Sequence, residues 1–181
     1  MKRRASAIVL LMILLVQMTV LDSGLDQGEG SPVKGPTRRD PYIDEDGSTI
    51  TIGNDNIEMT LDKGGKCGIT ELIDKSTGED LRGNKVPPPV LFMLRYWTGN
   101  STDIVIQWDA AVMTSDSIEN SEYAELTLNY YNFRGNNLNA TATIRLETES
   151  RYFDMNMDIE NHENFTVESL FFPGVWGIDA L

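Results

Sequence analysis

The sequence contains few of the residues on which small enzymes and nucleic-acid-binding proteins depend. Its 181 residues include one cysteine, one histidine, and 15 lysines and arginines against 28 acidic residues. A single cysteine, Cys67, excludes an intrachain disulfide, so packing alone must stabilise the fold. A formal net charge of −13 argues against a nucleic-acid partner, because a polyanionic backbone requires clustered basic side chains.

The sequence also offers no segment with two turns of amphipathic helix and capping residues. From Ser48 onward, apolar residues instead alternate with polar ones, which is typical of strands with one buried face. Residues 48–181 therefore predict an all-β, antiparallel β-sandwich of about ten strands. The clearest alternation runs through Ala124, Leu126, Leu128 and Tyr130, then Ala142, Ile144 and Leu146, then Phe153, Met155, Met157 and Ile159.

Earlier strands are expected on both sides of the turn Gly53-Asn54-Asp55-Asn56 and on both sides of the turn at residues 75–78. The more continuous apolar run from Val90 to Trp97 predicts a central strand, and Ile104 to Trp108 predicts the next one. The polar stretch from Met113 to Ser121 is interpreted as a longer connection.

The N-terminus predicts export. Lys2, Arg3 and Arg4 precede an apolar run from Ala5 to Leu21, so residues 1–24 are interpreted as a helical signal peptide or an N-terminal membrane anchor. Both alternatives stay open, and both place the rest of the chain outside the cell or on the outer face of its membrane. Residues 25–47 are rich in Gly, Pro and Asp and predict a disordered linker. Membrane contact is expected through the N-terminal segment alone.

Two stretches resemble a known family. Residues 50–62 and the hairpin Glu71-Leu72-Ile73-Asp74-Lys75-Ser76-Thr77-Gly78-Glu79-Asp80-Leu81, together with residues 159–162 and 170–178, are similar to galactose-mutarotase-like β-supersandwich domains. Such domains stand at the N-terminus of secreted glycoside hydrolases. The resemblance implies a non-catalytic, carbohydrate-associated module, with carbohydrate and a downstream catalytic barrel as its partners. It also implies that the sandwich is incomplete in this chain, as in a fragment of a longer enzyme.

The sequence predicts no catalytic residue, cofactor or metal site in this chain alone. Mutarotase chemistry needs an acid and a base, and the only histidine, His162, is interpreted as a solvated turn residue. Asp154, Asp158 and Glu160 share a strand face that we expect to be solvated. Two alternatives to the carbohydrate-associated module remain, namely a free-standing surface adhesion module and, less favoured, a small sugar epimerase.

The remaining candidates are tryptophans and asparagines. Trp97, Trp108 and Trp176 could stack on sugar rings, although we favour core packing for each and least firmly for Trp176. Asn100, Asn139 and Asn164 each begin an N-x-S/T sequence, so they are possible N-glycosylation sites. Cys67 is expected to be half-buried at the end of a turn.

Overall fold

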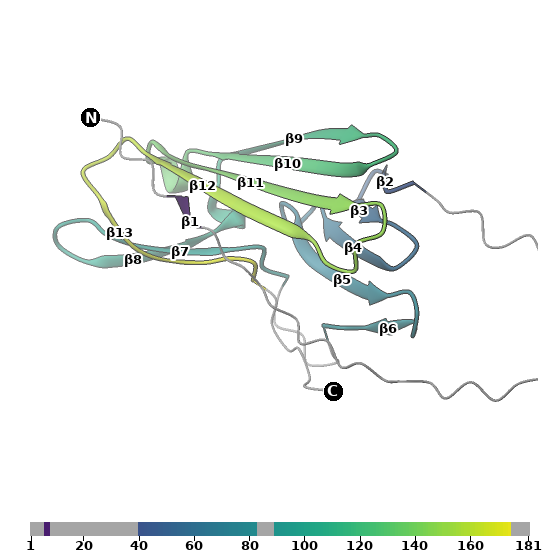
Figure 1. Ribbon diagram of the computed structural model, residues 1–181. Coiled ribbons are helices and arrows are strands. Elements are labelled where there is room, and N and C mark those ends of the chain that lie inside the picture. Colours follow the sequence, from purple (N-terminus) through teal and green to yellow (C-terminus); the bar gives the residue numbers. More distant parts are fainter. Residues whose placement is uncertain (1–5, 8–39, 83–88, 175–181) are drawn as a thin grey trace, which may run out of the picture.

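The computed structural model describes residues 6–7, 40–82 and 89–174, and every sheet in these residues is antiparallel (Figure 1). The predicted all-β sandwich is therefore confirmed. The described residues contain two short 3-10 turns and no α-helix, and thus no helix long and apolar enough to cross a bilayer. Except for Ser6 and Ala7, the predicted signal or anchor lies outside the described residues.

The first layer is a five-stranded sheet in the order β1-β12-β11-β10-β9. Its strands are β1 (Ser6–Ala7), β9 (Val112–Glu119), β10 (Tyr123–Tyr131), β11 (Leu138–Glu147) and β12 (Asp154–Asn161). The side chains of β10 and β11 alternate strictly between buried and half-buried, as their sequence predicts. This register places Leu126 opposite Ile144 and Leu128 opposite Ala142, so one face of the sheet is continuously apolar.

The second layer consists of two sheets that lie side by side across the core from the first (Figure 1). One has the order β2-β3-β4-β5-β6, with β2 (Tyr42–Glu45), β3 (Thr49–Gly53), β4 (Ile57–Asp62), β5 (Gly68–Asp74) and β6 (Glu79–Asp80). The other has the order β13-β7-β8, with β7 (Met93–Trp97), β8 (Thr102–Ile106) and β13 (Thr166–Phe171). The central strand predicted from Val90 to Trp97 is confirmed over Met93–Trp97, since β7 is the middle strand of its sheet.

The core joins all three sheets into one hydrophobic cluster. Its centre contains the rings of Phe92, Tyr130 and Phe133, with Phe92 edge-on to the other two at centroid distances of 5.1 and 5.8 Å. The hydroxyl of Tyr130 donates a hydrogen bond of 3.1 Å to the carbonyl oxygen of Lys66, which satisfies its one polar group.

The two sheets of the second layer are joined by a buried glutamine. Gln107 is fully buried in the 3-10 turn η1 (Gln107–Asp109) that follows β8. Its Nε2 donates to the carbonyl oxygen of Pro89 at 2.9 Å and to that of Gly65, in the turn between β4 and β5, at 3.5 Å. Its Oε1 accepts from the backbone N–H of Leu91 at 3.3 Å. Gly68 of β5 lies so close that a Cβ there would be 2.1 Å from the Pro89 oxygen, so the approach requires a glycine.

Three expectations about strand positions differ from the structure. Part of the expected linker is folded, since β2 pairs with β3 from Tyr42 opposite Gly53 to Glu45 opposite Ile50. The stretch interpreted as a connection at residues 113–121 is mostly strand β9, which pairs with β10. The strand expected from Ile104 to Trp108 starts at Thr102 and ends at Ile106, where η1 begins.

Candidate functional site

The outer face of the sheet β13-β7-β8 carries two exposed aromatic side chains, Trp97 and Phe171, together with polar side chains. Along β7, Leu94 and Tyr96 face the core, whereas Arg95 and Trp97 face solvent. This alternation follows from the period of two in a strand. The indole of Trp97 is 39% exposed, which is a large area for a residue in the central strand of a sheet.

Hydroxyl groups flank Trp97 on both sides. Thr102 of β8 and Thr166 of β13 lie directly opposite it in the two ladders. Side chains directly opposite each other on one sheet face are close neighbours, with Cβ atoms about 5 Å apart. The indole therefore lies between two groups that can both donate and accept hydrogen bonds.

An ion pair lies one step further along the same face. The Nε of Arg95 is 2.9 Å from Oε2 of Glu168, and the Thr102 hydroxyl donates to the same oxygen at 3.5 Å. Glu168 is the extra residue of a β-bulge, because the register passes from Val167 opposite Tyr96 to Ser169 opposite Arg95. Bulges redirect side chains, and here the bulge brings a carboxylate beside Arg95.

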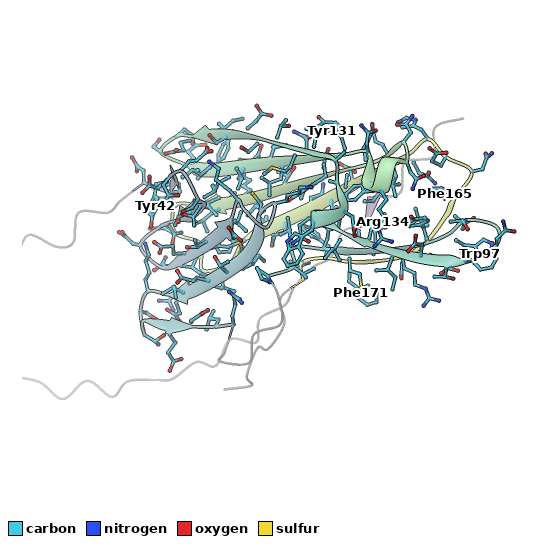
Figure 2. The ribbon with its side chains drawn as sticks, turned by 180° about the vertical axis from the view of Figure 1, so that it is seen from behind. Tyr42, Trp97, Tyr131, Arg134, Phe165 and Phe171 are labelled. Carbon is cyan, nitrogen blue, oxygen red and sulfur yellow. The ribbon has the colours of Figure 1, made fainter. Side chains whose placement is uncertain are left out.

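The far end of this face is apolar. Phe171 is 57% exposed and lies opposite Met93, which in turn lies opposite Ile106. Figure 2 shows Trp97 and Phe171 toward the two ends of the sheet, with Phe171 pointing away from the sandwich. We call this surface the Trp97 face, defined by Trp97, Thr102, Thr166, Arg95 and Glu168, with Phe171 at its apolar end.

The expectation that the tryptophans pack in the core is wrong for both that the structure describes. Trp97 is on the surface, and Trp108 in η1 is 42% exposed. Trp108 lies against the turn between β4 and β5, where a Cβ on Gly65 would be 3.0 Å from its Nε1. The two indoles lie at opposite ends of the β7–β8 hairpin and form no common platform. Trp176 lies outside the described residues.

A charged cluster behind the Trp97 face has no local signal in the sequence. Arg134 donates from Nη1 to Asp103 at 2.9 Å and from Nε to Asp109 at 3.0 Å, and Asp103 accepts from the hydroxyl of Tyr96 at 3.3 Å. The backbone N–H of Ile104, and then Arg134, lower the pKa of Asp103, whereas burial and the nearby Asp103 carboxylate raise the pKa of Tyr96. These partners satisfy one another, so we interpret the cluster as structural.

The carboxylates of β12 point into solvent. Asp154, Asp158 and Glu160 alternate with half-buried or buried residues on this strand. His162 is exposed at the end of β12, with its Nε2 3.7 Å from Oε2 of Glu160. Within the described part of the chain, no three His, Cys, Asp or Glu side chains are grouped so that they could hold a metal ion.

No protein-family model, curated protein or solved structure matches this chain. The likeness to β-supersandwich domains therefore stays a prediction from sequence. The fold and the Trp97 face are the observations on which a function can be argued.

Two of the three possible glycosylation sites border the Trp97 face. Asn100 is exposed in the β7–β8 turn, and Asn164 is exposed in the β12–β13 connection. Thr102 and Thr166, the third residues of these two sequences, are the same threonines that lie opposite Trp97. Asn139 is half-buried in β11, and its Oδ1 accepts a hydrogen bond of 3.1 Å from the backbone N–H of Asn132.

Proposed function

We propose that this chain is a non-catalytic, carbohydrate-associated β-sandwich module of an exported protein, and that the Trp97 face contacts the sugar. The exposed indole of Trp97 between two threonine hydroxyls is the observation that supports this proposal. The C–H groups of a pyranose ring pack on an aromatic π surface. Arg95, Glu168 and the threonines supply donors and acceptors for the sugar hydroxyls.

The shape of the site limits the kind of sugar. The Trp97 face is the outer surface of a sheet, and such a surface cannot enclose a small molecule as a pocket does. It suits a polysaccharide chain or a surface glycan, several of whose rings lie along the strands. The apolar end at Phe171 would extend this contact.

We propose a non-catalytic module because of the positions of the acidic side chains. Glycoside hydrolysis needs two carboxyl groups that face each other across the scissile bond, about 5 to 10 Å apart. The carboxylates of β12 share one solvated face, and Glu168 on the Trp97 face is paired with Arg95. We propose that any hydrolysis belongs to a separate catalytic domain that this module supports or orients.

The proposals that the chain is exported and that it has a catalytic partner domain rest on the sequence alone. Lys2, Arg3 and Arg4 before the apolar run support an extracellular or membrane-anchored location. Reading the gene beyond the codon for Leu181 tests the partner. A downstream barrel with paired carboxylates supports it, whereas a stop codon favours a free-standing adhesion module.

Sugar binding is tested with Trp97→Ala in affinity electrophoresis through gels that contain neutral polysaccharides. We expect the wild-type chain to be retarded by at least one polysaccharide and the variant to bind it about tenfold more weakly, because it loses the stacking platform. Trp97→Phe should retain most of the retardation, since a phenyl ring preserves an aromatic face.

Trp108→Ala is the matched control, because Trp108 is exposed to a similar degree at a distant position. Circular dichroism confirms that each variant is folded. Equal losses in Trp97→Ala and Trp108→Ala, or no retardation of the wild-type chain by any polysaccharide, would contradict the proposal.

A further inference from the structure

Strand β9 is an edge strand of the first layer. On one side it pairs with β10 without a bulge, from Val112 opposite Tyr131 to Glu119 opposite Ala124. Among the described residues, no strand pairs with its other side. Figure 1 shows β9 at the top of the view, at the end of its sheet. A regular edge of eight residues is a template on which another strand can pair.

Alternate backbone groups of β9 point away from β10. The N–H of Asn120 donates to the carbonyl oxygen of Tyr123 at 3.0 Å, where the β9–β10 hairpin closes. Hydrogen-bonded residues alternate along an antiparallel ladder, so the even-numbered residues of β9 bond to β10. Met113, Ser115 and Ser117 therefore direct their N–H and C=O groups toward the open edge.

The same edge carries two exposed apolar side chains. Val112 is 50% exposed and Ile118 is 52% exposed. Both lie on the outer face of the sheet, because they are opposite Tyr131 and Glu125, whereas the even-numbered residues of β10 face the core. Natural edge strands are commonly protected by Lys, Pro or a bulge, and β9 has none of these. Exposed apolar groups on such an edge indicate a contact surface.

The sequence of β9 is complementary to itself. Val112 and Ile118 lie three residues to either side of Ser115, and Thr114 and Asp116 lie one residue to either side. Antiparallel pairing about a two-fold axis at Ser115 sets Val112 opposite Ile118 of the second copy. It also sets Asp116 opposite Thr114 of the second copy. No carboxylate within the strand then faces another, and each exposed apolar side chain gains an apolar neighbour.

The neighbouring registers are less favourable. An axis at Asp116 would set the two copies of that carboxylate directly opposite each other, which is destabilising. An axis at Thr114 would set Val112 opposite Asp116 and leave Ile118 beyond the end of the partner strand. The axis at Ser115 also aligns the outward backbone groups, since Met113 then bonds to Ser117 of the second copy.

We propose that β9 pairs with β9 of a second copy of this chain, antiparallel about a two-fold axis at Ser115. The first sheets of the two copies then form one continuous sheet. Such an isologous interface uses the same surface patch of each copy. One pair of strands buries a small area, so we expect a dimer that forms at micromolar rather than nanomolar chain concentration.

Sedimentation velocity of the full chain tests the dimer. At about 100 µM we expect the wild-type chain to sediment as a dimer, and Ile118→Lys to weaken association at least tenfold. The substituted side chain can pair with Glu125 within its own sheet, so the fold should be retained, which circular dichroism checks. Ile104→Glu is the matched control, because Ile104 is 44% exposed in the edge strand β8, opposite Arg95.

The control should remain a dimer. A monomeric wild-type chain would overturn the proposal, as would an equal loss of association in Ile104→Glu. Association that persisted in Ile118→Lys would also overturn it, because contact through the apolar N-terminal run would be unaffected by this substitution.

Cross-linking tests the register. In the proposed dimer the two copies of Ser115 are directly opposite each other, with Cα atoms about 5.5 Å apart, which a disulfide can span. Ser117 and its counterpart are offset by four residues, or about 14 Å along the strands. With oxidised glutathione, Ser115→Cys should therefore form a covalent dimer, whereas Ser117→Cys and the wild-type chain, whose Cys67 is buried, should not. Equal cross-linking of the two variants, or none in Ser115→Cys, would contradict the proposed pairing.

Discussion

The side chain of Cys67 is fully buried in the turn that leads into β5, where the sequence predicts a half-buried residue. Burial raises the pKa of its thiol to about 12, and only the thiolate is a nucleophile. We therefore expect no labelling of the native chain by a thiol reagent at pH 8, and complete labelling in guanidinium chloride. Fast, stoichiometric labelling of the native protein would contradict this prediction.

The environment of Asp46 lowers the pKa of its side chain, whereas that of Cys67 raises it. Its Oδ1 accepts the backbone N–H groups of Ser48 at 2.7 Å and Thr49 at 2.6 Å, which lower the pKa of the exposed carboxyl to about 2. The folded-state pKa lies below the unfolded value of about 3.9. The stabilisation is therefore complete above that value and is lost as pH falls through about 2.

This prediction is checked by following the Asp46 carboxyl carbon in an NMR titration, which should give a midpoint near pH 2. Asp46→Asn keeps the acceptor oxygen and removes the titration. Its free energy of unfolding should consequently depend less on pH between 4 and 2 than that of the wild-type chain. A midpoint near 3.9 would show that the backbone N–H groups do not stabilise the carboxylate.

The orientation of Trp97 could have been predicted from its sequence position, unlike the charged cluster around Arg134. Arg95 and Trp97 are two residues apart in a strand and therefore share a face, and an arginine is rarely buried. The three charged members of the cluster, Asp103, Asp109 and Arg134, come from separate elements. Their pairing depends on how η1 packs beside the β10–β11 connection, which no local pattern encodes.

Single side chains also join whole elements. Asn54, in the β3–β4 turn, is fully buried, and its Nδ2 donates to the carbonyl oxygens of Glu147 at 2.9 Å and Ser150 at 2.8 Å. Its Oδ1 accepts the backbone N–H groups of Asn56 at 2.8 Å and Ile57 at 3.0 Å. One amide therefore closes the turn and fastens it to the β11–β12 connection in the other layer.

Asn54→Ala should lower the free energy of unfolding by about 3 kcal/mol, because several buried polar groups lose their partner. Urea unfolding followed by tryptophan fluorescence measures the change. Asn56→Ala is the control, since Asn56 bonds the same connection through Glu149 from a more exposed position, and about 1 kcal/mol or less is expected. Similar losses in both variants would show that burial does not distinguish the two amides.

At the level of elements, strands with one apolar face were predictable and the edge strands were not. β10, β11 and β12 show the period of two because one face of each covers the core. β2 and β9 lie at the ends of their sheets, and no side chain of either strand is fully buried. Backbone pairing with one neighbour holds them, so their composition resembles that of a loop.

The molecule as a whole depends on polar contacts between segments far apart in sequence. Gln107 joins the two sheets of the second layer through its bond to Gly65, and Asn54 joins that layer to the first across more than ninety residues. Alternation alone predicts that sheets stack but does not determine how three sheets are arranged. Such buried amides need partners for all their hydrogen-bonding groups. They therefore favour one arrangement of the three sheets over other arrangements that would bury a similar apolar area.

The same arrangement brings the Trp97 face and two glycosylation sequences to one end of the molecule. If an exporting host modifies the folded chain, we expect glycans at Asn100 and Asn164, which are exposed in connections, and not at Asn139, which is half-buried in a strand paired on both sides. A glycan on Asn100 or Asn164 starts within a few residues of Trp97 or of its neighbour Thr166 and would compete for the indole surface.

Intact-mass measurement of chain secreted by a glycosylating host, with peptide mapping of the three sites, tests the occupancy. Enzymatic removal of the glycans should then strengthen the retardation by polysaccharide, and the double variant Asn100→Gln with Asn164→Gln should behave like the deglycosylated chain. Asn139→Gln should change neither mass nor retardation, because no glycan is expected there. Modification of Asn139 alone would contradict the expectation that exposed asparagines are the ones modified. Unchanged retardation after deglycosylation would show that the glycans do not compete with polysaccharide for the Trp97 face.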